Sequence, residues 1–207
     1  MSGGIEFSNL SSKLNPLPTA FLPSIFYIRE LLATSRVIEI YENYTKQTIR
    51  NRCEILTANG IQVLSIPVKH GKGLKLLTKD VLIDYSTKWY IEHTRAIKTA
   101  YASAPYFEEY FDGLNDILLR KHDFLIDINH ELLDYIFRML DLNEPLTQTT
   151  EFISNKKYLE VNYLDKHVNP CSSYQQIIGF SENFIPNLSI IDLLFNEGPM
   201  ARKFILD

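Results

Sequence analysis

The chain has 207 residues, of which 45% are hydrophobic and 22% are charged, and its formal net charge is -4. This length suits one large domain or two small ones, and the hydrophobic share supplies a sizeable core and excludes a disordered chain. The negative total disfavours a general nucleic-acid binder, although it says nothing about a local basic patch.

Cysteine usage and apolar runs narrow the class of protein further. Cys53 and Cys171 form no Cys-x-x-Cys pair, so neither a metal site nor a disulfide framework is expected. Residues 1–15 are polar and predict a flexible arm without the apolar core of a signal peptide. No apolar run approaches the ~20 residues of a membrane span. We therefore expect a cytoplasmic protein in which residues 16–207 form a single domain.

The N-terminal part predicts a strand, a helix and a second strand. Residues 17–22 are apolar, Ser24 is a suitable N-cap for a helix over 25–33, and residues 36–41 are β-branched and roughly alternating. Strand, helix and strand within ~25 residues are typical of a right-handed βαβ unit with parallel strands.

A β-hairpin is predicted after the polar residues that follow this unit. Its strands are 53–57 and 62–68, joined by Ala58-Asn59-Gly60. Asn-Gly is a strong hairpin signal because both residues accept a positive φ. A basic loop over 69–79 then leads to another short strand at 81–85.

The remaining chain is predicted to be mainly helical. Trp89 and His93 share one face of a first helix with Ile97 and Ala100, and Pro105 ends that helix.

Further helices are expected after Pro105. One starts near Tyr106, a second is capped by Asp123, and a last one covers about 188–195, with Gly198 as its C-cap and Pro199 as a stop. Residues 146–183 predict extended or irregular structure. The fold class is therefore α/β: a mixed sheet with an N-terminal βαβ-like unit and a β-hairpin, followed by a mainly helical half packed on it.

The polar stretch 43–52 is the first candidate binding site. Arg50 and Arg52 offer rigid forks of donors that suit phosphate or carboxylate. The stretch also carries Lys46 as a point charge, the amides Asn43, Gln47 and Asn51, and Tyr44. Together they suit an anionic small molecule such as a nucleotide or nucleotide-sugar. The alternative is a solvated loop whose charges pair with Glu42 and Glu54.

The start of the first helix is a second candidate. The turn at Pro23-Ser24 presents free N–H groups and the positive end of the helix dipole, which suit an anion. An ordinary helix cap is the alternative. The sequence contains neither a GxGxxG fingerprint nor a GxxxxGK[ST] phosphate loop.

Two titratable side chains are candidates for catalysis. His93 could act as a general base if Asp84 or Asp192 oriented it, and the alternative is a packed, hydrogen-bonded histidine. Asp192 and Asn196 are four residues apart and share a helix face, so both could point into one pocket. Ser189 and Asp192 have capping-box spacing, which is the structural alternative.

Several segments resemble the WbqC-like protein family. The matching pieces, in order, are 18–23 (PTAFLP), 42–47 (ENYTKQ), 50–52 (RNR), 64–68 (LSIPV), Asp84-Tyr85 with Trp89 and His93, 104–107 (APYF) and 187–196 (NLSIIDLLFN). The Asn-Arg pair before a hairpin that ends in Ile-Pro-Val, combined with the C-terminal helix, is specific. Longer family members open with a Gln-Pro-x-Tyr-x-Pro turn, whereas residues 20–24 read Ala-Phe-Leu-Pro-Ser and lack the Gln and a Tyr.

The resemblance implies a role in bacterial surface-polysaccharide (O-antigen) biosynthesis, and for some members a glycine transfer to an amino sugar has been suggested. Our hypothesis is a transferase in which the basic residues of 43–52 hold an activated anionic donor, the amides orient the acceptor and His93 removes a proton. Outside that stretch, the substrate-binding candidates are Lys69, Trp89, Asn187 and Asn196.

Other functional readings stay open. One is a non-catalytic protein that binds a nucleotide-sugar or polyanion through the same residues. Another is a nucleic-acid-associated enzyme with a local basic groove, which the acidic total disfavours. No cofactor is expected, and the sequence leaves a homo-oligomer open.

Overall fold

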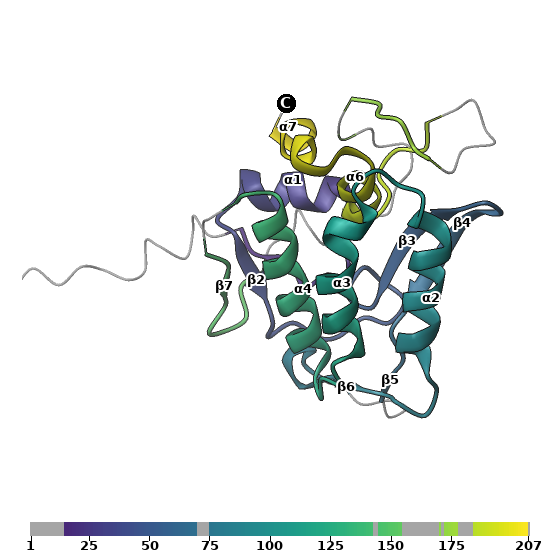
Figure 1. Cartoon of the computed structure of the whole chain (residues 1–207). Helices are drawn as coiled ribbons and strands as arrows, with labels where there is room; N and C mark the ends of the chain where they lie inside the picture. Colours follow the sequence, from purple (N-terminus) through teal and green to yellow (C-terminus); the bar gives the residue numbers. More distant parts are fainter. Residues whose placement is uncertain are drawn as a thin grey trace, which may run out of the picture.

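The computed structural model describes residues 15–69, 75–142, 145–154, 170, 172–177 and 184–206. The predicted arm over 1–15 lies outside these ranges except for its last residue. The architecture is mixed α/β, as predicted, with short strands and a hairpin on which the helices pack (Figure 1). One hydrophobic cluster extends from Leu17 to Ile205. Among the described residues, no helix combines the length and apolar character needed to cross a bilayer.

The predicted βαβ unit is present. Strands β1 (Leu17–Pro18) and β2 (Val37–Glu39) pair in parallel, and helix α1 (Ile25–Ala33) connects them. The Ser24 hydroxyl caps α1 by accepting the Tyr27 N–H at 3.3 Å.

A third strand completes this sheet. Strand β7 (Thr147–Gln148) comes from the segment predicted as extended or irregular, and it pairs in parallel with β2. The strand order is β1-β2-β7.

The predicted hairpin is formed by β3 (Arg52–Thr57) and β4 (Gly60–Ser65), which pair antiparallel. Only Gly60 of the turn has a positive φ, at +99°. Asn59 does not adopt the positive φ that this residue type can accept. The turn residues are Ala58 and Asn59, and the glycine follows them as the first residue of β4.

The second hairpin strand ends earlier than predicted. The ladder stops at Ser65, two residues before Pro67, which has no N–H to donate. The chain then forms β5 (Val68–Lys69), which pairs antiparallel with β6 (Leu82–Ile83). A 3-10 turn, η2 (Thr78–Asp80), precedes β6.

The helical half runs across one face of the molecule (Figure 1). Helices α2 (Trp89–Tyr101), α3 (Phe107–Leu119) and α4 (Leu125–Met139) lie side by side. The predicted apolar face of α2 is buried. Asp123 does not cap α4, because the N-cap residue is Phe124 and no side chain caps this helix.

The C-terminal segment contains a helix that the sequence did not reveal. Gly198, at φ +54°, ends α6 (Ile190–Glu197) as predicted. Pro199 does not end the helical structure at this point. It sits in the 3-10 turn η3 (Gly198–Met200), where its fixed φ is compatible, and α7 (Ala201–Leu206) follows. In Figure 1, α1, α6 and α7 gather at one end of the molecule.

Candidate functional site

A cluster of polar and aromatic side chains forms where the hairpin meets the first turns of α2. Arg52 lies directly opposite Ser65 in the β3–β4 ladder, and Asn51 Nδ2 donates to Ser65 Oγ at 3.4 Å. The His93 ring interacts with the Ser65 backbone, and the Trp89 ring packs edge-on against His93 with centroids 5.1 Å apart. These residues, Asn51, Arg52, Ser65, Trp89 and His93, are called the Ser65 cluster below.

Several buried polar atoms of the Ser65 cluster lack a hydrogen-bond partner in the part of the chain that the structure describes. They are Asn51 Oδ1, Arg52 Nε, Trp89 Nε1 and His93 Nδ1. An unsatisfied buried polar group costs about 1–3 kcal/mol, so folded proteins retain few of them. Two of these atoms belong to consecutive residues of the chain and two to rings in contact on α2, so a polar ligand that reached either pair would satisfy more than one group.

Charge in this region comes from arginine and not from histidine. Burial lowers the pKa of His93 to about 4, and the Ser65 backbone only partly opposes this effect. The imidazole is therefore neutral at pH 7. Burial also raises the pKa of Tyr44 to about 12, while the charges of Arg50 and Arg52 act in the opposite direction. Arg52 thus supplies the positive charge of the Ser65 cluster, with a protonated phenol nearby.

Arg50 has a different environment, although it is only two residues away from Arg52. Its Nε and Nη2 donate to Glu42 Oε1 at 2.7 and 2.6 Å, and its Nη1 donates to Thr48 Oγ1 at 3.1 Å. Both members of the ion pair are buried. The alternative prediction is therefore correct that Arg50 pairs with Glu42, and wrong that this charge belongs to a solvated loop.

The remaining candidates of the polar stretch lie on its surface. Asn43, Lys46 and Gln47 are exposed, and no hydrogen bond joins their side chains to the Ser65 cluster within the described ranges. Lys69 is exposed on β5. Its charge assists the Ser86 hydrogen bonds, which are the main cause of the lowered pKa of Asp84.

Asp192 and Asn196 hold a segment of the chain against α6. The buried Asp192 carboxylate accepts the hydroxyls of Tyr101 at 2.9 Å and Tyr174 at 2.5 Å, and Nε2 of Gln176 at 3.0 Å. Asn196 Oδ1 accepts the N–H of the residue after Gln176 at 3.2 Å. The expectation that both side chains point into a pocket is therefore wrong, because this segment occupies them.

Neither expected partner orients His93. The Asp84 carboxylate accepts the Ser86 N–H at 2.9 Å. Asp192 is bonded near the C-terminal end of α2, at Tyr101, which lies about 12 Å along the helix axis from His93 at 1.5 Å per residue. The predicted His93 pairing with Asp84 or Asp192 is thus not formed.

The N-terminus of α1 is filled by the chain itself. Asn187 Oδ1 accepts the Phe26 N–H at 3.0 Å, and the Leu188 carbonyl accepts the Ile25 N–H at 3.1 Å. With Ser24 capping the next amide, the predicted anion site is an ordinary cap, and Asn187 is part of it.

The predicted capping box of α6 is not formed either. The Ser189 hydroxyl donates to the Leu22 carbonyl at 2.8 Å, and no side chain caps α6. Leu22 is fully buried at φ +40°, a region that few side chains adopt. The loop after β1 is therefore held in place by the C-terminal half of the chain.

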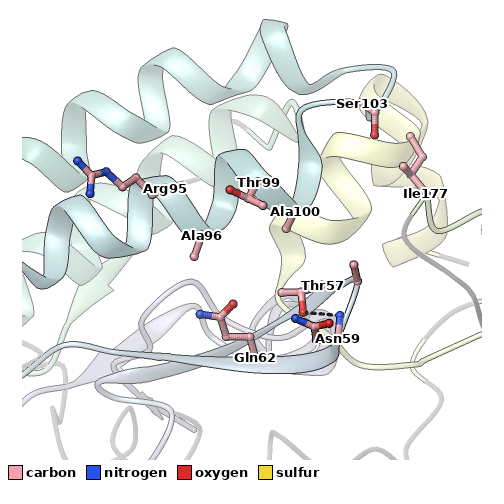
Figure 2. Close-up of a pocket in the computed structure, with 10 residues that line it drawn as sticks. Thr57, Asn59, Gln62, Arg95, Ala96, Thr99, Ala100, Ser103 and Ile177 are labelled. Carbon is pink, nitrogen blue, oxygen red and sulfur yellow. Dashed lines mark hydrogen bonds between the residues drawn. The ribbon is translucent and has the colours of Figure 1, made fainter.

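Sequence reasoning missed a hollow between α2 and the hairpin. It has a volume of about 630 Å³ and is shown in Figure 2. Arg95, Thr99 and Ser103 line one side at four-residue spacing, and Thr57 and Gln62 line the other. That spacing is visible in the sequence, but spacing along one helix does not reveal a cavity. Nothing local indicated that a hairpin would lie opposite it.

Metal ligands do not gather in the described part of the chain, where no group of three His, Cys, Asp or Glu side chains could hold an ion.

Comparison with known proteins gives the family. The sequence model of the WbqC-like protein family matches residues 19–166 and 151–204. The uncharacterized protein Rv1507c of Mycobacterium tuberculosis is 28% identical over 212 residues, covering 85% of this chain and 90% of that protein. No solved structure matches. Because the family match covers most of the chain, from the first loop to the last helix, the protein belongs to the WbqC-like protein family.

Proposed function

We propose that the protein is a transferase of bacterial surface-polysaccharide biosynthesis that binds an activated, anionic donor at the Ser65 cluster. One observation carries the proposal. The Arg52 guanidinium makes no ion pair or hydrogen bond within the described residues, and its Nε is buried. Arg50, two residues earlier, is fully engaged by Glu42 and Thr48. Of the two guanidinium groups, only that of Arg52 is available for a ligand.

The chemistry that fits this arrangement is acyl transfer to an amine or hydroxyl. The nucleophile forms a bond to the acyl carbon, the bond to the donor's leaving group breaks, and the leaving group departs with its negative charge. Arg52 would hold that charge, while the free acceptor atom of Asn51 would orient the nucleophile. The proton lost by the nucleophile would pass to His93.

A second candidate function is binding without catalysis, and one observation favours it. A histidine whose pKa is about 4 is a weak base at neutral pH. A bound anion beside the ring would raise this pKa, since opposite charge favours the protonated form. The catalytic proposal therefore requires that the donor be bound before His93 becomes an effective base.

A thermal-shift screen tests the proposal with the full chain. Nucleotides, nucleotide-sugars and glycyl donors would be added to the wild type, Arg52→Ala and Arg52→Lys. A ligand that binds only the folded state raises the Tm by mass action. We expect one class to raise the Tm of the wild type, to act less on Arg52→Lys, which keeps the charge and loses the fork, and to have no effect on Arg52→Ala. Arg202→Ala, an exposed arginine paired with Asp141, is the control.

The outcomes separate the candidates. Binding with turnover of donor and acceptor supports the transferase. Binding at Arg52 without turnover of any donor and acceptor pair supports the binding protein. If no probe binds, or if Arg52→Ala responds like the wild type, the Ser65 cluster is not the site.

A further inference from the structure

We infer that the cavity between α2 and the hairpin is a second ligand site, for a polyhydroxylated small molecule that carries one anionic group. This inference goes beyond the proposed function and does not depend on it. The cavity has a volume of about 630 Å³, and none of its lining residues belongs to the Ser65 cluster.

The walls of the cavity come from two elements that lie side by side. Figure 2 shows α2 on one side and the hairpin on the other, with Gln62 rising from β4 toward Ala96. Arg95 lies at one end of the helical row and Ser103 at the other. Ala96 and Ala100 line the helix between them, and such short side chains leave room for a ligand against the backbone.

The hydrogen-bonding groups of these walls are available. Arg95, Thr99, Ser103 and Gln62 make no side-chain hydrogen bond or ion pair within the described ranges, although all of them line the cavity. Hydroxyl and amide groups both donate and accept hydrogen bonds, so they can pair with the hydroxyls of a sugar, which also do both. A molecule with several hydroxyls would satisfy more of them than an apolar molecule of the same size.

The opposite wall is held rigid by its own turn. Thr57 Oγ1 donates to the Gly60 carbonyl at 2.8 Å and accepts the Asn59 N–H at 3.2 Å. This hydroxyl is therefore committed to the turn, and Asn59 is presented from a fixed backbone. A site built on such preorganised elements loses less entropy when a ligand binds.

Charge selects the class of ligand. Of the described residues that line the cavity, Arg95 alone is charged, and none carries a carboxylate. A guanidinium binds carboxylate and phosphate through paired N–H donors. A cationic ligand would be repelled, and a neutral polyol would gain nothing from the charge of the exposed Arg95. A sugar carrying one carboxylate or one phosphate satisfies both the hydroxyl and amide groups and the arginine.

Isothermal titration calorimetry on the full chain tests this inference with three probes: glucuronate, glucose 1-phosphate and glucose. We expect at least one charged probe to bind the wild type more tightly than glucose does. Comparison of glucuronate with glucose 1-phosphate identifies the preferred anion. Arg95→Ala should weaken the charged probe by roughly 10-fold or more, because a hydrogen bond to a charged group is lost. Thr99→Val, which keeps the side-chain shape, should weaken it by roughly 3-fold to 10-fold.

Two controls separate this site from the proposed donor site. Lys98→Ala removes an exposed cation from the same helix outside the cavity lining and should leave the affinity unchanged. Arg52→Ala should also leave it unchanged. The inference is overturned if neither charged probe binds at millimolar concentration, if Arg95→Ala and Thr99→Val bind like the wild type, or if only Arg52→Ala loses binding. The last result would place the probe at the Ser65 cluster instead.

Discussion

Arg52 lies directly opposite Ser65 in the β3–β4 ladder, and His93 of α2 interacts with the backbone of the same Ser65. Ser65 therefore links the end of the polar stretch, through its strand partner Arg52, to a helix that begins nearly forty residues later. The Ser65 cluster lies where the open end of the hairpin meets the first turns of α2. The predictions below separate its functional residues from the structural residues around it.

The two neighbouring arginines should differ in their effect on stability. Arg50→Ala leaves the buried Glu42 carboxylate without its cation, so we expect a loss of about 3–5 kcal/mol in the free energy of unfolding. Arg52→Ala breaks no ion pair and should cost less than about 1 kcal/mol. Urea unfolding, followed by fluorescence of the one tryptophan, Trp89, measures both. Glu42→Gln added to Arg50→Ala should recover part of the loss, and equal losses for the two single variants would contradict the assignment.

His93 should make stability depend on pH below neutrality. Its pKa falls from 6.5 to about 4 on folding, so the unfolded chain binds more protons between these values. Stability therefore decreases as the pH falls through this window, by about 2 kcal/mol from this group between pH 7 and pH 5. His93→Gln removes the titrating group, and its unfolding free energy should change less over the same range. A parallel pH dependence for the wild type and the variant in urea titrations would show that His93 is not buried as a neutral group.

Asp192 should act on stability and not on ligand binding. Asp192→Asn replaces one carboxylate oxygen by an NH₂ group, which cannot accept a hydrogen bond. Either the Tyr101 hydroxyl, or the Tyr174 hydroxyl together with the Gln176 amide, therefore loses its acceptor. We expect a loss of about 1–3 kcal/mol. At a temperature where the variant is folded, a ligand of the Ser65 cluster should bind with unchanged affinity in calorimetry. A variant that is as stable as the wild type but inactive would restore Asp192 as a catalytic residue.

Gly60 and Gly198 both have a positive φ, so the same substitution can be compared at the two positions. Gly60→Ala should cost roughly 1–2 kcal/mol from backbone strain alone, because nothing lies within 4 Å of the added Cβ. Gly198→Ala adds a Cβ that would overlap the Tyr106 ring to the same kind of strain, so the loss should be roughly 2–5 kcal/mol. Thermal unfolding compares them, and the ranking would be wrong if Gly60→Ala had the larger effect.

Local signals in the sequence were sufficient for much of the fold. Ser24 before an apolar helix, the four-residue repeat from Trp89 along α2, and Gly198 after α6 each predict an element through contacts within a few residues. Such contacts depend on backbone geometry and side-chain type, which a single segment carries. The missed helix α7 has only six residues, too few to show a helical period.

The sequence by itself determined the α/β class, most elements and the stretch from which the candidate site is drawn. Only the tertiary structure decided that Arg50 forms an ion pair with Glu42 while Arg52 does not, and that Asn187 caps a helix 161 residues away in the chain. It also placed Arg95 opposite the hairpin. The physical reason is that the partner of a polar side chain is set by long-range packing. Two arginines of identical chemistry, separated by one residue, therefore differ in what the fold brings to them.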